Sequence, residues 1–134
     1  MSKCILVVDD EVEVTKALRL RLTKLGHEVT CVSSGGEAIK TFLGVYYSRP
    51  FDVILLDIGL PDVNGCDVLR TIRQEEELRG LNYDDGVKIV MQTGFKESWM
   101  EAFNGGCDDY VMKPYSFEEL LEKINEKKTK SQTG

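Results

Sequence analysis

The chain has 134 residues, of which 42% are hydrophobic and 30% charged, a balance typical of a single water-soluble globular domain. Its net charge of −6 at pH 7 argues against direct nucleic-acid binding, which requires clustered Lys and Arg. The sequence has no membrane-length apolar run, no secretory signal and no Cys-x-x-Cys pair. We therefore expect a cytoplasmic protein with reduced cysteines, without a cysteine zinc site or membrane association.

Short apolar runs alternate with helical patterns from one end of the chain to the other. In chain order, the predicted elements are a strand at 4–8, a helix from about 14 to 25, a strand at 28–32, a helix from about 38 to 43, a strand at 53–56, a helix beginning near 64, a strand at 87–91, a helix at 96–104, a strand at 110–112 and a helix at 117–124. The last helix is preceded by a capping box, Ser116 to Glu119, which is typical of a helix N-terminus.

Three stretches between or after these elements read as solvent-exposed. The acidic residues 75–77 and the turn-rich stretch 81–86 predict one long solvated connection after the third helix. His27 has no neighbours at metal-ligand spacing and is predicted to lie in a surface loop. Residues 128–134 are polar and are predicted to form a C-terminal tail.

Strands that alternate with helices predict a doubly wound α/β fold, a three-layer sandwich around a parallel sheet. Ligands of such folds bind outside the carboxyl ends of the strands. Five polar residues follow the ends of four predicted strands, and we expect them to converge: Asp9, Asp10, Asp57, Thr93 and Lys113.

Each of these residues has a simpler explanation when it is taken alone. Asp9 and Asp10 could cap the first helix, Thr93 could belong to a turn, and Lys113 could be a solvated charge. Together, however, three crowded carboxylates repel one another and raise each other's pKa unless a cation lies between them. Oxygen ligands at an open site suit Mg²⁺, and a Lys and a Thr hydroxyl can bind an anion. The pattern therefore predicts a site for a divalent metal and a phosphoryl group.

These motifs resemble the receiver domains of two-component response regulators over residues 1–127. The matching residues are the acidic pair Asp9-Asp10, Asp57 in "LLDIGLPDVNG", Thr93-Gly94 and "DYVMKP", which ends in Lys113-Pro114. The resemblance implies a flavodoxin-like fold with a five-stranded parallel sheet in the order 2-1-3-4-5, and a cis bond before Pro114.

The resemblance also implies the chemistry of the site. Asp57 is expected to accept a phosphoryl group from a histidine kinase or a histidine phosphotransfer protein. Mg²⁺, or Mn²⁺, is expected to bind Asp10, Asp57 and the backbone carbonyl of Gly59, with Asp9 acting through water.

Other residues are expected to complete the transfer and to report it. Lys113 is expected to offset charge on the transferring oxygens, and Thr93 to bind the phosphoryl group on Asp57. Tyr110 is expected to switch its rotamer in response and so change the partner-binding face. If Met100 and Phe103 face the sheet, Trp99 points outward from that face.

On this interpretation the chain is not an enzyme but a phosphoacceptor switch that promotes its own phosphorylation and dephosphorylation. Its expected partners are the kinase or phosphotransfer protein and either a downstream protein target or a tethered output domain. The chain is expected to be either a stand-alone receiver or one cut from a larger regulator or hybrid kinase.

Two other functions share parts of this pattern. A haloacid-dehalogenase-like phosphatase also uses a nucleophilic Asp, Mg²⁺ and a Lys, but it requires a second Asp two residues after the first, where this chain has Gly59. A flavodoxin-like FMN-binding module needs a hydroxyl-rich loop after the first strand. Here Asp9, Asp10 and Glu11 would repel the phosphate of FMN.

Overall fold

The computed structural model describes residues 2–94 and 99–128, without the side chains of Tyr83 and Trp99. Its elements are β1 (Cys4–Val8), α1 (Val12–Lys24), β2 (Glu28–Val32), α2 (Gly35–Gly44), β3 (Val53–Asp57), α3 (Gly65–Leu78), a 3₁₀ turn (Tyr83–Asp85), β4 (Lys88–Thr93), α4 (Trp99–Asn104), β5 (Asp109–Met112) and α5 (Phe117–Asn125). The predicted alternation of strands and helices is confirmed.

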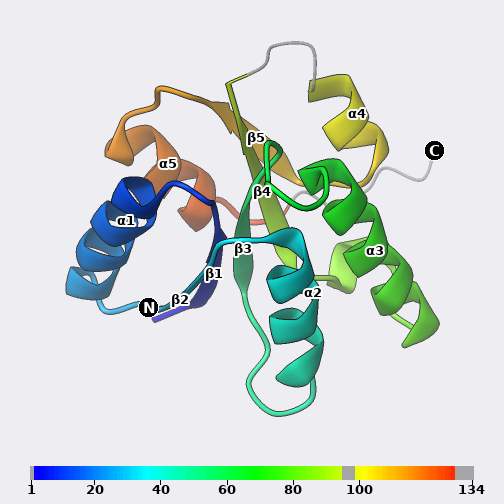
Figure 1. Ribbon diagram of the computed structural model, residues 1–134. Coiled ribbons are helices and arrows are strands. Elements are labelled where there is room, and N and C mark those ends of the chain that lie inside the picture. The colour runs from blue at the N-terminus through cyan, green and yellow to red at the C-terminus, as the bar shows by residue number, and fades with distance from the viewer. Residues whose placement is uncertain (1, 95–98, 129–134) are drawn as a thin grey trace.

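The strands form one parallel sheet in the order β2-β1-β3-β4-β5. Helices α1 and α5 cover one face, and α2, α3 and α4 cover the other (Figure 1). The predicted doubly wound, three-layer sandwich with strand order 2-1-3-4-5 is therefore confirmed. The order reverses between β1 and β3, which is where ligands bind in such sheets.

Alternating side chains of the inner strands build two separate cores. Leu6, Ile54 and Ile89 face the layer of α2, α3 and α4, whereas Ile5, Leu55 and Val90 face the layer of α1 and α5. Because successive strand residues point to opposite faces and both faces are covered, the central parts of the inner strands are apolar. This explains why β3 is buried at all five positions.

Side-chain caps fix the start of three helices. Ser34 Oγ accepts a hydrogen bond from Glu37 N at the start of α2, and Asn64 Oδ1 accepts one from Cys66 N at the start of α3. Ser116 Oγ accepts a hydrogen bond from Glu119 N at 3.0 Å, as the capping box predicted. Each cap satisfies a backbone N–H group that has no partner within its helix.

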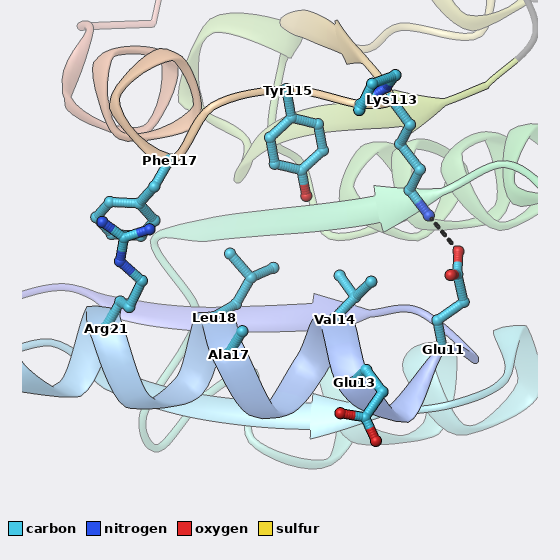
Figure 2. Close-up of a pocket in the computed structure, with 10 residues that line it drawn as sticks. Glu11, Glu13, Val14, Ala17, Leu18, Arg21, Lys113, Tyr115 and Phe117 are labelled. Carbon is cyan, nitrogen blue, oxygen red and sulfur yellow. Dashed lines mark hydrogen bonds and ion pairs between the residues drawn. The ribbon is translucent and has the colours of Figure 1, made fainter.

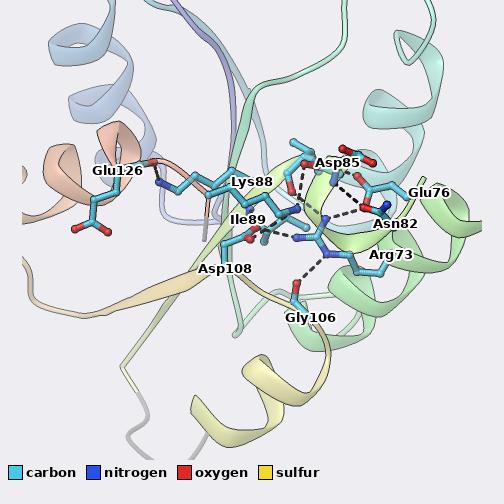
Figure 3. Close-up of polar contacts among 12 residues, drawn as sticks. Arg73, Glu76, Asn82, Asp85, Lys88, Ile89, Gly106, Asp108 and Glu126 are labelled. Carbon is cyan, nitrogen blue, oxygen red and sulfur yellow. Dashed lines mark hydrogen bonds and ion pairs between the residues drawn. The ribbon is translucent and has the colours of Figure 1, made fainter. Parts of the chain in front are cut away.

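The prediction of a long solvated connection after α3 is partly wrong. Helix α3 continues through residues 75–77 to Leu78, and Glu76 is only 3% exposed. Its carboxylate accepts hydrogen bonds from Arg73 Nη1 at 2.7 Å and from Val87 N. Arg73 in turn donates to Asp108 and to the carbonyl of Gly106 (Figure 3). A buried polar network, which local sequence does not reveal, therefore replaces solvent here.

Two smaller expectations are also corrected. His27 is buried, at 8% exposed, and its Nδ1 accepts a hydrogen bond from the backbone N–H of Lys3. On α4, Met100 is 56% exposed and Phe103 40% exposed, whereas Ala102 is fully buried. Ala102 therefore faces the sheet, so the premise used to orient Trp99 is wrong, and the Trp99 side chain itself lies outside the described residues.

The C-terminal end of the described chain packs against the sheet. Lys128 Nζ donates a hydrogen bond to the carbonyl of Gly86 at 3.1 Å, and Lys88 donates to the carbonyls of Lys123 and Glu126. The boundary between residues 127 and 128 remains a prediction, since residues 129–134 are not described. Among the residues that are described, no helix has the length and apolarity needed to cross a membrane.

Candidate functional site

The predicted polar residues lie at the carboxyl edge of the sheet. Asp9 and Asp10 directly follow β1, Asp57 is the last residue of β3, Thr93 is the last residue of β4, and Lys113 directly follows β5. The structure brings Asp9, Asp57 and Lys113 into direct contact. The edge of the sheet therefore gathers charges that are far apart in the sequence.

Lys113 is the cation of this cluster. Its Nζ lies 3.0 Å from Asp9 Oδ2, 3.2 Å from Asp57 Oδ2 and 3.1 Å from Glu11 Oε1. Burial alone would lower the pKa of Lys113, but hydrogen bonds and charges from Asp9, Asp57 and Glu11 raise it above its ordinary value. Lys113 is therefore a permanent positive charge at neutral pH.

Asp57 is the central carboxylate of the cluster, and only 9% of its side chain is exposed. Its Oδ1 accepts a hydrogen bond from Gly59 N at 3.2 Å. Burial and the neighbouring charge of Asp9 raise the pKa of Asp57, against the opposing effect of Lys113. The negative form of Asp57 thus lacks full compensation, and a further cation beside it would stabilise that form.

The loop after Asp57 is held by two close approaches. Gly65 has no room for a Cβ, which would overlap the carbonyl oxygen of Asp57 and Cα of Ile58. Asp62 reaches the start of α2, where its two oxygens accept hydrogen bonds from Gly35 N at 2.8 Å and Gly36 N at 2.9 Å. These backbone hydrogen bonds lower the pKa of Asp62 and tie the loop after Asp57 to α2.

Asp9, Asp10 and Asp57 can each offer a carboxylate oxygen to one metal ion. Their oxygens lie within 4.8 Å of one another, with Asp10 exposed and the other two buried. This all-oxygen donor set, open to solvent on one side, fits a hard divalent cation such as Mg²⁺. Asp9 is not the N-cap residue of α1. The N-cap residue is Glu11, whose backbone N–H donates a hydrogen bond to Asp9 Oδ1 at 2.9 Å.

Thr93 and Tyr110 lie on the neighbouring strands β4 and β5, where Thr93 is the last residue of β4 and Tyr110 lies opposite Met91. Thr93 is 1% exposed, and its carbonyl accepts a hydrogen bond from Lys113 N at 2.8 Å. Tyr110 is half-buried in the core below α4, where its ring meets that of Phe103 edge-to-face at 5.8 Å. The bond between Lys113 and Pro114 is cis, as the resemblance implied.

The sequence analysis assigned no role in the site to two residues that the structure places there. Glu11 contacts Lys113 at the end of a groove of about 630 Å³ that runs between α1 and the start of α5 (Figure 2). Its position beside Asp9 and Asp10 was the only signal in the sequence. Asp62, which lies in the loop after Asp57 and accepts hydrogen bonds from the start of α2, gave no local signal, because its two partners are more than 25 residues away.

Comparisons with known proteins agree with this geometry. Residues 5–125 match the family described as the response regulator receiver domain. The transcriptional regulatory protein KdpE of Mycobacterium tuberculosis is 35% identical over 120 residues, which are 90% of this chain and 48% of that protein. The chain thus spans about half the length of the curated relatives it matches.

Solved structures give the same result. A CheY-like receiver domain protein from Methanospirillum hungatei is 33% identical, with a TM-score of 0.74 over 92% of this chain and 91% of that one. The response regulator TrrA of Thermotoga maritima, solved in complex with Mg²⁺ and BeF, is 32% identical, with a TM-score of 0.72 over 91% and 96% of the two chains. These matches set aside the haloacid-dehalogenase-like alternative. The chain belongs to the response regulator receiver domains, which act as phosphoacceptor switches in two-component signalling.

Proposed function

We propose that Asp57 is the residue of this chain that accepts the phosphoryl group. The observation that supports it best is the contact of the buried Asp57 carboxylate with the Lys113 ammonium group at 3.2 Å, next to two further carboxylates. Asp9 shares the burial, the contact with Lys113 and a place in the potential metal site, but Asp57 is the aspartate that ends β3 within the stretch "LLDIGLPDVNG", where the resemblance to receiver domains implies the acceptor. The donor is the phosphohistidine of a histidine kinase or of a histidine phosphotransfer protein.

The acidic cluster is proposed to hold Mg²⁺, or Mn²⁺ in its place. Asp10, Asp57 and the backbone carbonyl of Gly59 are the proposed direct ligands, and Asp9 acts through water. The bound ion supplies positive charge that offsets the negative charge of the phosphoryl oxygens. The donor set and the uncompensated charge at Asp57 support this assignment.

In the transfer step, one Asp57 oxygen forms a bond to phosphorus while the phosphorus–nitrogen bond of the donor histidine breaks. The electron pair of that bond remains on the imidazole nitrogen, which leaves with the donor. Lys113 hydrogen-bonds the transferring oxygens, and positioning with charge compensation provides most of the rate of such reactions. The chain thereby promotes its own phosphorylation, and the same site promotes attack of water on the acyl phosphate.

The phosphorylated state is proposed to act through Thr93 and Tyr110. The Thr93 hydroxyl binds a phosphoryl oxygen, and Tyr110 changes its rotamer and repacks the face of α4, β5 and α5. Such a switch needs only a few kcal/mol of differential contact between its two states. The recipient is a downstream protein or an output domain tethered to residues 1–127, with residues 128–134 as the polar tail that follows.

Intact-mass measurement tests the acceptor assignment. Wild-type protein incubated with Mg²⁺ and acetyl phosphate is expected to gain one phosphoryl group, and Asp57→Asn to gain none. Asp67→Asn, the same substitution at an exposed aspartate on α3, is the matched control and should behave as wild type. Equal labelling of Asp57→Asn and wild type would show that Asp57 is not the acceptor.

Metal dependence is tested in the same assay. Asp10→Ala is expected to abolish labelling because it removes a direct ligand, and excess EDTA should do the same to the wild type. Restoring Mg²⁺ or Mn²⁺ after EDTA should restore the label. Labelling that is indifferent to EDTA would contradict the proposed metal site.

A further inference from the structure

The ammonium group of Lys113 is fully occupied by carboxylates. A lysine ammonium has three N–H donors, and Lys113 has three partners: Asp9 at 3.0 Å, Glu11 at 3.1 Å and Asp57 at 3.2 Å. While Asp57 is still a free carboxylate, an incoming phosphoryl oxygen can gain a hydrogen bond from Lys113 only if one of these contacts is released. The identity of the released partner therefore affects phosphoryl binding.

Burial distinguishes the three partners. The side chain of Asp9 is fully buried and that of Asp57 is 9% exposed, whereas that of Glu11 is 60% exposed. An exposed carboxylate regains water when its ion pair breaks, but a buried one is left without compensation. Glu11 is therefore the partner that Lys113 releases at least cost.

The side chain of Glu11 binds Lys113 and does not cap α1. Glu11 is the N-cap residue of α1, yet its side chain makes no capping hydrogen bond. Its N–H is held by Asp9 Oδ1 at 2.9 Å, and its side chain extends to Lys113 at the end of the groove (Figure 2). By contrast, Glu13, the second residue of α1, points away from Lys113 in the same view.

We propose that Glu11 is a positioning residue that restrains Lys113 in the unmodified state and so limits binding of the phosphoryl group; the inference rests on the proposed function of Asp57. Two effects act in the same direction. Glu11 competes with the phosphoryl oxygens for a Lys113 donor, and its negative charge repels them. The buried Asp9 contact keeps Lys113 in place without Glu11, so loss of Glu11 does not release Lys113 from the site.

Beryllofluoride, a phosphoryl mimic, gives a direct equilibrium test on the full chain. At saturating Mg²⁺, calorimetric titration of Glu11→Gln should show half-saturation at a beryllofluoride concentration about two- to fivefold lower than in wild type, the range for loss of an exposed ion pair. Glu13→Gln changes net charge equally on the same helix and should match wild type. Affinities of Glu11→Gln and Glu13→Gln that coincide, or weaker binding by Glu11→Gln, would overturn the proposal.

A second titration separates this effect from metal binding. Glu11→Gln should bind Mg²⁺ alone no more tightly than wild type, because it removes negative charge near the cation, so tighter anion binding cannot come from the metal. Tighter Mg²⁺ binding that accounts for the whole gain would contradict the proposal. Failure of the proposed function would give a different result in the intact-mass assay. Either the wild-type protein would gain no phosphoryl group, or the Asp57→Asn variant would gain it as readily as the wild type.

Discussion

Substitution of Arg73 by Met tests the network at the amino edge of β4 and β5. The guanidinium group of Arg73 donates to Glu76, to Asp108 and to the carbonyls of Val87 and Gly106. Methionine keeps much of the apolar stem but removes the charge and every donor. The two carboxylates that remain are only 4% and 3% exposed, so water cannot replace the lost partner.

The expected loss is large relative to the stability of the chain. Removing one partner of a buried ion pair costs about 3–5 kcal/mol, whereas domains of this kind have a total free energy of unfolding of about 5–15 kcal/mol. Arg70→Met is the matched control, since Arg70 lies on the same helix and pairs with Asp67 and Glu101 while 41% exposed. Exposed pairs contribute about 1 kcal/mol at most.

Urea unfolding monitored by circular dichroism measures both losses. The triple variant Arg73→Met/Glu76→Gln/Asp108→Asn should recover part of the stability lost by Arg73→Met. The amide oxygens can still accept the hydrogen bonds from Val87 N and Ile89 N, and neither position then carries a buried negative charge. Recovery is only partial because Lys128, which is 13% exposed, loses its ion pair with Asp108. Equal losses for Arg73→Met and Arg70→Met would refute the reasoning that burial of the network determines its energetic weight.

Three further outcomes are expected in equilibrium unfolding. Gly65→Ala should destabilise strongly because its Cβ would overlap the backbone of Asp57 and Ile58, whereas Gly44→Ala, with open space around its Cβ, should stabilise α2 by up to about 1 kcal/mol. Ser116→Ala should cost about 1 kcal/mol by removing the cap of α5. Burial lowers the pKa of His27, so the unfolded chain binds its proton more readily. Wild type should therefore lose more stability than His27→Asn between about pH 8 and about pH 5, and equal pH dependence would contradict this.

The sheet and its functional edge were predictable because both follow from local patterns. Short β-branched apolar runs such as 4–8 and 53–56 are typical of strands covered on both faces, and parallel strands place their carboxyl ends at one edge. Asp9, Asp57 and Lys113 each follow such a run, so their meeting at 3.0–3.2 Å is a consequence of topology. No knowledge of side-chain contacts was needed to expect it.

Features that depend on distant partners were not predictable. Glu76 lies in a run of three glutamates that reads as solvated, and only its contacts with Arg73 and Val87 N make its burial tolerable. The buried His27 accepts a hydrogen bond from the backbone N–H of Lys3, the residue directly before β1. In both cases a tertiary partner decides the environment of a polar residue, and hydrophobic periodicity contains no information about that partner.

The balance between carboxylates and cations differs at the two edges of the sheet. At the amino edge, the buried carboxylates of Glu76 and Asp108 are balanced by Arg73 and Lys128, which is the arrangement that burial of charge requires. At the carboxyl edge, Asp9, Glu11 and Asp57 contact one ammonium group, and the Asp10 carboxylate lies beside those of Asp9 and Asp57. Such an imbalance opposes folding, since like charges raise each other's pKa and are relieved only by a ligand. Because the balanced network anchors α3, β4 and the turn before β5 at the opposite edge, the fold can retain an uncompensated negative cluster where a cation and a phosphoryl group are expected to bind.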